Sequence, residues 1–200
     1  MPVALAYPST FTGIVPIPLS HDIRSTAAFY YNGQSGQPYS IVFNGDANGD
    51  GVTTNDIVFV PSSADQVNVI NGTFDQLMAY INSDCSMKDA KGTIPERNSC
   101  TSPWLNQLDF RYSVPLPTGG RTHVELTLDI LNLLNLLNKD WGSNLYPNLN
   151  SPIPIGYSGL VNGKETYNLS TITSPNFLGT FTRDDLRSRW QAQFGARFRF

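Results

Sequence analysis

Hydrophobic and polar residues alternate strictly over residues 189–200, at the end of the chain. One side carries Trp190, Ala192, Phe194, Ala196, Phe198 and Phe200, and the other carries Arg189, Gln191, Gln193, Gly195, Arg197 and Arg199. This period of two predicts a β-strand, because successive side chains of a strand point to opposite faces. The segment also has roughly the 9–11 residues that a tilted strand needs to cross a bilayer. We therefore predict a membrane-crossing strand here, with an edge strand of a soluble β domain as the alternative.

The same alternation predicts further strands upstream. They lie near residues 11–19, 23–43, 104–116 and 122–132, and the terminal strand occupies 188–200. We interpret 23–43 as one long strand with a bulge at a stretch that contains Gly and Pro. In the hairpin 104–132, one face is apolar and the other carries the charges of Asp109, Arg111, Glu125 and Asp129.

The connections between these strands are of two kinds. Short turns occur near Ser20 and Gly119, whereas residues 44–103 and 139–186 form two long loops. Short periplasmic turns and long extracellular loops are typical of outer-membrane barrels. The sequence therefore predicts an all-β fold, in which residues 1–200 form a curved, antiparallel segment of about five strands of a transmembrane β-barrel. Its apolar side chains would face lipid, and its charged side chains would line the interior.

Two stretches depart from the strand pattern. Apolar residues recur at helical spacing at Phe74, Leu77, Met78 and Ile81, which predicts a short helix over residues 74–82. The leucine-rich stretch 131–141 is ambiguous. We interpret its leucines as a buried strand end, with a helical turn as the alternative.

Composition and charge limit the possible classes of function. The chain has 200 residues, of which 14% are charged, and a net charge of −3, which gives no reason to expect nucleic-acid binding. No run of about 18 apolar residues is present, so no transmembrane helix is expected. The N-terminus lacks the basic start and the long apolar region of a signal peptide. If the protein works outside the cytoplasm, we expect its export signal on sequence beyond these residues, and the chain is then a fragment.

The two cysteines, Cys85 and Cys100, close a short polar loop. In an oxidising compartment we expect them to form a disulfide, which stabilises a loop of about 15 residues by roughly 3 kcal/mol. In the cytosol they would remain two thiols. Their spacing is not that of a metal site, and no histidine accompanies them.

A cluster of oxygen-bearing residues in the first long loop has the spacing of a calcium loop. Its candidate ligands are the side chains of Asp46, Asn48, Asp50 and Asp56 and the carbonyl of Val52. The EF-hand pattern needs a bidentate acid where this chain has Ile57, so Asp56 comes one residue early. The alternative is a turn cluster of Asn, Gly and Asp without metal.

The two histidines, His21 and His123, stand alone in the sequence. No motif for Ser/His/Asp catalysis accompanies either of them. We therefore expect no enzymatic activity.

An ordered set of motifs carries a family resemblance. They are YNGQSGQPY at 31–39, GDANGDG at 45–51, NDIVFVP at 55–61, RNSC at 97–100 with PW at 103–104, DILNLLN at 129–135 with WG at 141–142, and the terminal Phe200. With these motifs in this order, the chain resembles the C-terminal part of Oar-like TonB-dependent outer-membrane receptors. Receptors of this type are often preceded by a carboxypeptidase-regulatory-like domain.

The resemblance implies a non-catalytic part of a receptor for energy-coupled uptake of an unidentified ligand. It implies the outer membrane of a Gram-negative bacterium, with the long loops outside the cell and membrane lipid as a partner. It also implies that the barrel assembly machinery reads the terminal strand through Trp190, Phe194, Phe198 and Phe200. The energy-coupling TonB complex would be reached only through N-terminal parts beyond this chain. The rival interpretation is a secreted β-sandwich, an adhesion or carbohydrate-binding module with a calcium loop.

Overall fold

A computed structural model describes residues 8–20, 23–119, 122–147, 153–177 and 179–200. The chain divides into two compact units. Unit 1 is formed mainly by Gly36–Ser102 and Tyr146–Thr182, and unit 2 by Leu5–Ser35, Pro103–Leu145 and Arg183–Phe200. Strands predominate over helices in the described residues, and the largest sheet is antiparallel throughout. The mostly-β, antiparallel character predicted from the sequence is therefore confirmed.

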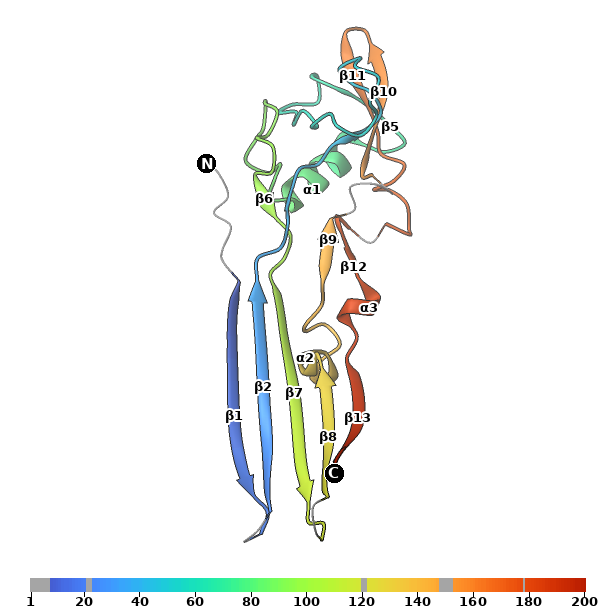
Figure 1. Ribbon diagram of the computed structural model, residues 1–200. Helices are drawn as coiled ribbons and strands as arrows, with labels where there is room; N and C mark the ends of the chain where they lie inside the picture. Colours follow the sequence, from blue (N-terminus) through green and yellow to red (C-terminus); the bar gives the residue numbers. More distant parts are fainter. Residues whose placement is uncertain (1–7, 21–22, 120–121, 148–152, 178) are drawn as a thin grey trace. The chain divides into compact units, whose positions relative to one another are not determined.

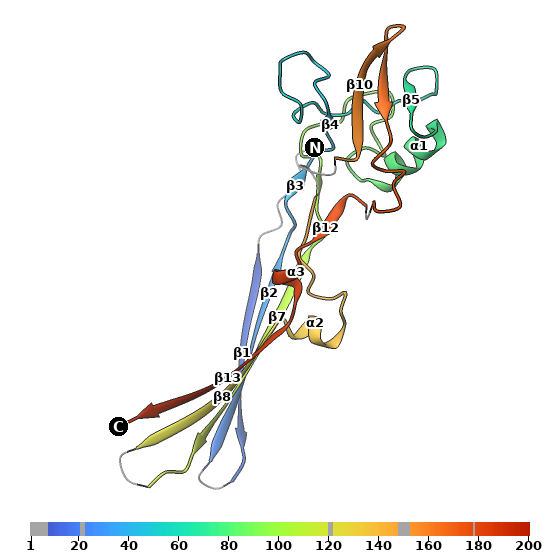
Figure 2. The ribbon, with the colours of Figure 1, turned by 90° about the vertical axis from the view of Figure 1, so that its right-hand side faces the viewer.

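Unit 2 is built around one five-stranded sheet, whose strands lie side by side in Figures 1 and 2. In spatial order the strands are β1 (Ser9–Pro18), β2 (Arg24–Gln34), β7 (Leu105–Leu116), β8 (His123–Leu131) and β13 (Gln191–Arg199). Every neighbouring pair is antiparallel. The connections β1–β2 and β7–β8 are short and lie at one end of the strands, and the long segments leave from the opposite end. This is the asymmetry that the sequence predicted.

Two strand boundaries differ from the sequence prediction. The strand predicted over 23–43 leaves the sheet after Gln34, and the chain then forms the separate short strands β3 (Pro38–Tyr39) and β4 (Phe43–Asn44). Pro38 has no N–H to continue a ladder, which is consistent with this break. The terminal strand begins at Gln191 rather than 188, because the helix α3 (Asp185–Ser188) precedes it.

The stretch 131–141 contains a helix, so the interpretation as a buried strand end is wrong. Strand β8 ends at Leu131, the next residue Asn132 has a φ of 54° in the left-handed region, and α2 (Leu133–Leu137) follows. Leu137 is 67% exposed. The side chain of Asn135 is buried instead, and its Nδ2 donates to the carbonyl oxygens of Lys139 at 2.8 Å and Trp141 at 3.0 Å. An asparagine that satisfies these carbonyls explains why polar residues recur between the leucines.

Unit 1 is formed by the two segments that the sequence predicted to be polar loops. Its four-stranded sheet has the order β4, β10 (Ile155–Val161), β11 (Lys164–Asn168), β5 (Asn68–Ile70). Strands β10 and β11 are antiparallel, whereas β4 pairs with β10 and β5 with β11 in parallel. Strand β3 pairs with β6 (Cys100–Thr101), and β9 (Leu145–Pro147) pairs with β12 (Phe181–Arg183).

A hydrophobic core joins the two segments of unit 1. Its largest fully buried side chains are Tyr39, Ile41, Phe43, Leu77, Ile81, Met87, Ile155, Tyr167 and Leu169. The helix α1 (Phe74–Ser83) supplies Leu77 and Ile81 at the spacing that predicted it, so this prediction is confirmed. Thr73 caps the helix, since its Oγ1 accepts from the backbone N–H of Gln76 and the Gln76 side chain accepts from that of Thr73. Within the described residues, no helix is both long and apolar enough to cross a membrane.

Candidate functional site

The register of the five-stranded sheet gathers apolar side chains on one face. This apolar face comprises Phe11, Val15 and Ile17 of β1, Ala27, Phe29 and Tyr31 of β2, Leu108, Phe110, Tyr112, Val114 and Leu116 of β7, Val124, Leu126, Leu128 and Ile130 of β8, and Ala192, Phe194, Ala196 and Phe198 of β13. The rings of Phe29 and Phe110 lie 5.1 Å apart across neighbouring strands. Phe194 is 80% exposed and Phe11 is 66% exposed. Large hydrophobic side chains therefore remain uncovered on a continuous surface.

The opposite, polar face carries paired charges. Arg111 and Asp129 stand opposite each other on β7 and β8, with Nε and Oδ1 3.4 Å apart. Arg197 and Glu125 are paired on β13 and β8, with Nη1 and Oε2 3.8 Å apart. The sequence placed Asp109, Arg111, Glu125 and Asp129 on one face, and the register confirms this. On β7, β8 and β13 the sheet thus separates an apolar surface from one that carries these charges.

A polar cavity of about 470 Å³ opens on the polar face, at the end of the strands from which the long segments leave. Side chains that line it include Gln107, Asp109, Asn132, Asn144, Arg187 and Arg189. Asp109 Oδ1 accepts from the backbone N–H of Asn132 at 2.8 Å. The amides and guanidinium groups around the cavity can bind water or a polar solute.

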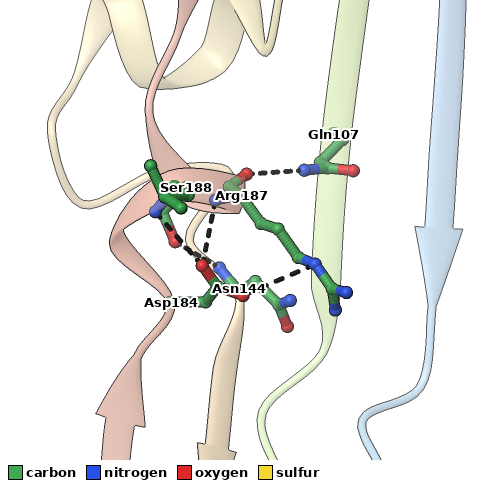
Figure 3. Close-up of polar contacts among 6 residues, drawn as sticks. Gln107, Asn144, Asp184, Arg187 and Ser188 are labelled. Carbon is green, nitrogen blue, oxygen red and sulfur yellow. Dashed lines mark hydrogen bonds and ion pairs between the residues drawn. The ribbon is translucent and has the colours of Figure 1, made fainter.

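Hydrogen bonds fix α3 beside this cavity (Figure 3). Asp184 caps the helix by accepting from the backbone N–H groups of Leu186 at 3.1 Å and Arg187 at 3.0 Å. The Asn144 N–H donates to Ser188 Oγ at 2.9 Å. Gln107 Nε2 on β7 donates to the Arg187 carbonyl oxygen at 3.2 Å. These bonds hold α3, with its Arg187, beside strand β7 of the sheet.

The residues predicted to form an assembly signal lie in and beside β13. Phe194 and Phe198 are strand residues of the apolar face, 80% and 59% exposed. Trp190 precedes the strand, and its backbone N–H donates to Asn135 Oδ1 at 3.4 Å. Phe200 follows the strand and is fully exposed. The aromatic side chains therefore stand free for contact with another surface.

The predicted calcium loop is closed by its own hydrogen bonds. Asp46 accepts from the backbone N–H groups of Gly49 at 2.7 Å, Asp50 at 3.1 Å and Gly51 at 2.9 Å. Asp56 Oδ2 accepts from the N–H groups of Ala47 at 2.7 Å and Asn48 at 3.2 Å.

Asp50, in the middle of the same loop, is also fully engaged. Hydrogen bonds from Asn55, Val52 and Asn48 lower the pKa of its carboxyl group. Across the described residues, no three Asp, Glu, His or Cys side chains gather as metal ligands. As placed, the carboxylates of Asp46, Asp50 and Asp56 all accept N–H groups of the loop itself. The arrangement favours the turn alternative, and the calcium assignment, including a Val52 carbonyl ligand, stays an untested prediction.

Replacing Asp46 with alanine removes the acceptor of three backbone N–H groups. We expect the amide hydrogens of Gly49, Asp50 and Gly51 to exchange about fivefold faster or more, since a typical hydrogen bond contributes ~1 kcal/mol. Hydrogen exchange measured by NMR checks this, with Asp65→Ala as a control at another exposed carboxylate of unit 1. If protection in the unmodified chain requires added calcium, the turn alternative is wrong.

The two cysteines are joined in a disulfide, with Cα atoms 6.0 Å apart. The bond ties the segment after α1 to β6. Beside it, the Tyr39 hydroxyl donates to Asp84 Oδ2 at 3.1 Å and lies 3.4 Å from Cys85 Sγ. Burial and the neighbouring Asp84 carboxylate raise the pKa of Tyr39. This corner of unit 1 is therefore covalently closed, with the side chains of Tyr39 and Asp84 buried beside the bond.

Unit 1 also contains a cavity of about 400 Å³ that sequence reasoning did not anticipate. Its lining includes Asp56, Phe59, Arg97 and Glu165. Arg97 looks like an ordinary loop charge in the sequence, and Glu165 is far from it along the chain. Only the pairing of the two long segments brings them to one cavity.

His123 lines neither of the two cavities described above. His21 lies outside the described residues. His123 begins β8, is exposed and stands opposite Arg199 of β13.

No protein-family model, no curated protein and no solved structure matches the chain.

Proposed function

We propose that unit 2 is a segment of the wall of an outer-membrane β-barrel, with its apolar face in contact with lipid and its polar face lining a watery interior. The observation that carries this proposal is the continuous apolar face, on which Phe11, Phe194 and Phe198 are exposed. Its strands have 9 to 12 residues. This is close to the ~9–11 that a tilted strand needs to cross a bilayer.

A barrel wall must continue beyond these strands. Strands β1 and β13 each have a neighbour on one side only within the sheet. In a membrane every backbone N–H and C=O must be paired, so both edges would pair with further strands of a closed barrel. The short connections would then face the periplasm, and the two segments that form unit 1 would lie outside the cell.

We further propose that this barrel is a TonB-dependent receptor of the Oar-like type, which takes up an unidentified ligand and performs no catalysis. The ordered motifs of the sequence and the asymmetry of the connections support this assignment. Exposed aromatic residues of β13 offer the assembly machinery its binding signal. Contact with the energy-coupling TonB complex would belong to N-terminal parts of the receptor. The family resemblance implies that these parts also include a plug domain inside the barrel.

Nitroxide scanning tests the lipid contact. In phospholipid vesicles, a label at Phe194→Cys should collide more with oxygen, and one at Gln193→Cys should collide more with a water-soluble nickel complex. The native cysteines are held in their disulfide and do not react with the label. A label at Thr54→Cys, on an exposed residue of unit 1, should be water-accessible in every case.

Two results would favour the rival, a secreted β-sandwich module. In the first, the chain stays in the aqueous fraction without detergent. In the second, the labels at positions 193 and 194 show no difference in collision rates. The receptor type has a separate test, because the reading frame upstream should encode a plug and a signal peptide.

A further inference from the structure

We propose that the 400 Å³ cavity of unit 1 binds the charged end of a peptide or a free α-amino acid. The cavity lies wholly within unit 1, so this inference does not rest on the membrane assignment. It is formed by residues after β4, by the segment around Arg97 and by Glu165 of β11. Its size is within the range of ~300–1,000 Å³ that ligand pockets occupy.

Both signs of charge line this cavity. Arg97 donates through Nη2 to the Asn55 carbonyl oxygen at 3.2 Å. A guanidinium group has five N–H donors, so others are left for a carboxylate, which it can bind in a bidentate manner. Glu165 Oε2 accepts from the Tyr167 hydroxyl at 3.0 Å, and the rest of its carboxylate can accept from an ammonium group. A zwitterion matches this pair of charges.

Asn55 adds a further acceptor to the same lining. Its Nδ2 donates to Asp50 Oδ2 at 2.8 Å. Its Oδ1 is buried and has no hydrogen-bond partner among the described residues. Leaving a buried acceptor unpaired is unfavourable, so a donor supplied by a ligand would stabilise this site.

The remaining walls are apolar, and their geometry favours a peptide over a sugar. Phe59, Ile57 and Ile94 offer surface to an aliphatic or aromatic side chain. Recognition of a sugar ring usually needs an open aromatic face. Phe43 is 1% exposed, with its ring 5.0 Å from that of Tyr167, and Phe59 is half-buried, so neither aromatic residue of the lining offers a fully open face.

Calorimetric titration of the full chain, purified in mild detergent, tests the proposal. The probe is trialanine, and trialanine blocked by N-acetylation and C-amidation is its uncharged control. We expect trialanine to bind and the blocked peptide to bind at least tenfold more weakly. Arg97→Ala should weaken the binding of trialanine roughly 10- to 100-fold, as expected when a charge-assisted hydrogen bond is lost. Lys91→Ala, which removes an exposed cation from the same segment, should leave it unchanged.

A second variant covers the case in which Arg97→Ala disturbs the fold. Glu165→Gln keeps an acceptor for the Tyr167 hydroxyl and removes only the charge, so it should weaken trialanine binding while the circular dichroism spectrum stays the same. Equal affinity for free and blocked trialanine would overturn the proposal. So would an absence of heat with trialanine, or binding of maltotriose in its place. None of these results would bear on the nitroxide test of the barrel wall.

Discussion

Leu128→Arg is expected to destabilise the membrane-embedded chain by about 2–4 kcal/mol, the cost of an arginine on the lipid face near the bilayer midplane. Leu128 lies in the middle of β8, opposite Tyr112 on one side and Phe194 on the other. Its side chain belongs to the apolar face, where a guanidinium group would lose its hydration. Urea unfolding in phospholipid vesicles measures the change.

The neighbouring residue Thr127 provides a matched control on the opposite face. It stands between Ser113 and Gly195 in the register, so an arginine there has room and water. We expect Thr127→Arg to change stability by no more than about 0.5 kcal/mol, as for ordinary surface substitutions. Equal effects of the two variants would contradict the separation of the faces. A large effect of Leu128→Arg in aqueous buffer without detergent would indicate a soluble core instead.

Removing the disulfide with the double variant Cys85→Ser, Cys100→Ser is expected to destabilise unit 1 by about 3 kcal/mol. The physical reason is the added freedom of the unfolded chain, since the bond closes a loop with a sequence separation of 15. A loss of this size lowers the Tm of a domain of about 100 residues by roughly 10–20 °C. Thermal unfolding followed by circular dichroism is the measurement.

A reducing agent supplies the control for this prediction. It should lower the Tm of the unmodified chain to that of the double variant and leave the variant itself unchanged. A variant with an unaltered Tm would mean that the bond contributes nothing to unit 1. A reductant effect on the variant would point to a cause other than the bond between Cys85 and Cys100.

The long strands could be predicted from the sequence because one face of each strand differs chemically from the other. On β13, residues of the polar face and residues of the apolar face alternate from Gln191 to Arg199. A shift of the register by one residue would therefore place arginines on the apolar face. The hairpin β7–β8 follows the same rule, with Arg111 and Asp129 meeting across it. Helix α1 was predictable because Leu77 and Ile81 lie one turn apart.

Unit 1 could not be predicted in this way. Its strands β4 and β5 have two and three residues, too few to show a period. The pair Phe43 and Ile155 is adjacent in a parallel ladder although the two residues are more than a hundred positions apart. Periodicity describes only local structure, so a core assembled from distant short segments gives no local signal. The cavity at Arg97 and Glu165 was missed for the same reason.

Short polar motifs gave a second kind of ambiguity. The Asp46 cluster has the spacing of cation ligands, but the same residue types also close turns by accepting backbone N–H groups. Spacing alone does not separate these uses, and both leave the hydrogen bonds of Asp46 and Asp56 to the loop N–H groups in place. In the stretch 131–141 the leucines suggested burial, yet the buried residues are Asn132 and Asn135.

The shared core of unit 1 constrains how this chain can be inherited and made. Tyr39 and Phe43 of this core come from one segment, and Ile155 and Tyr167 come from the other. Transferring either segment alone into a related protein would therefore leave half of the core without the residues it packs against. Exchange between relatives should therefore move both segments together. During synthesis the first segment is made before the second, so it cannot complete the core at once. Contacts of large sequence separation also form slowly. A chain in this interval exposes apolar surface, and a holdase that binds such surface would protect it.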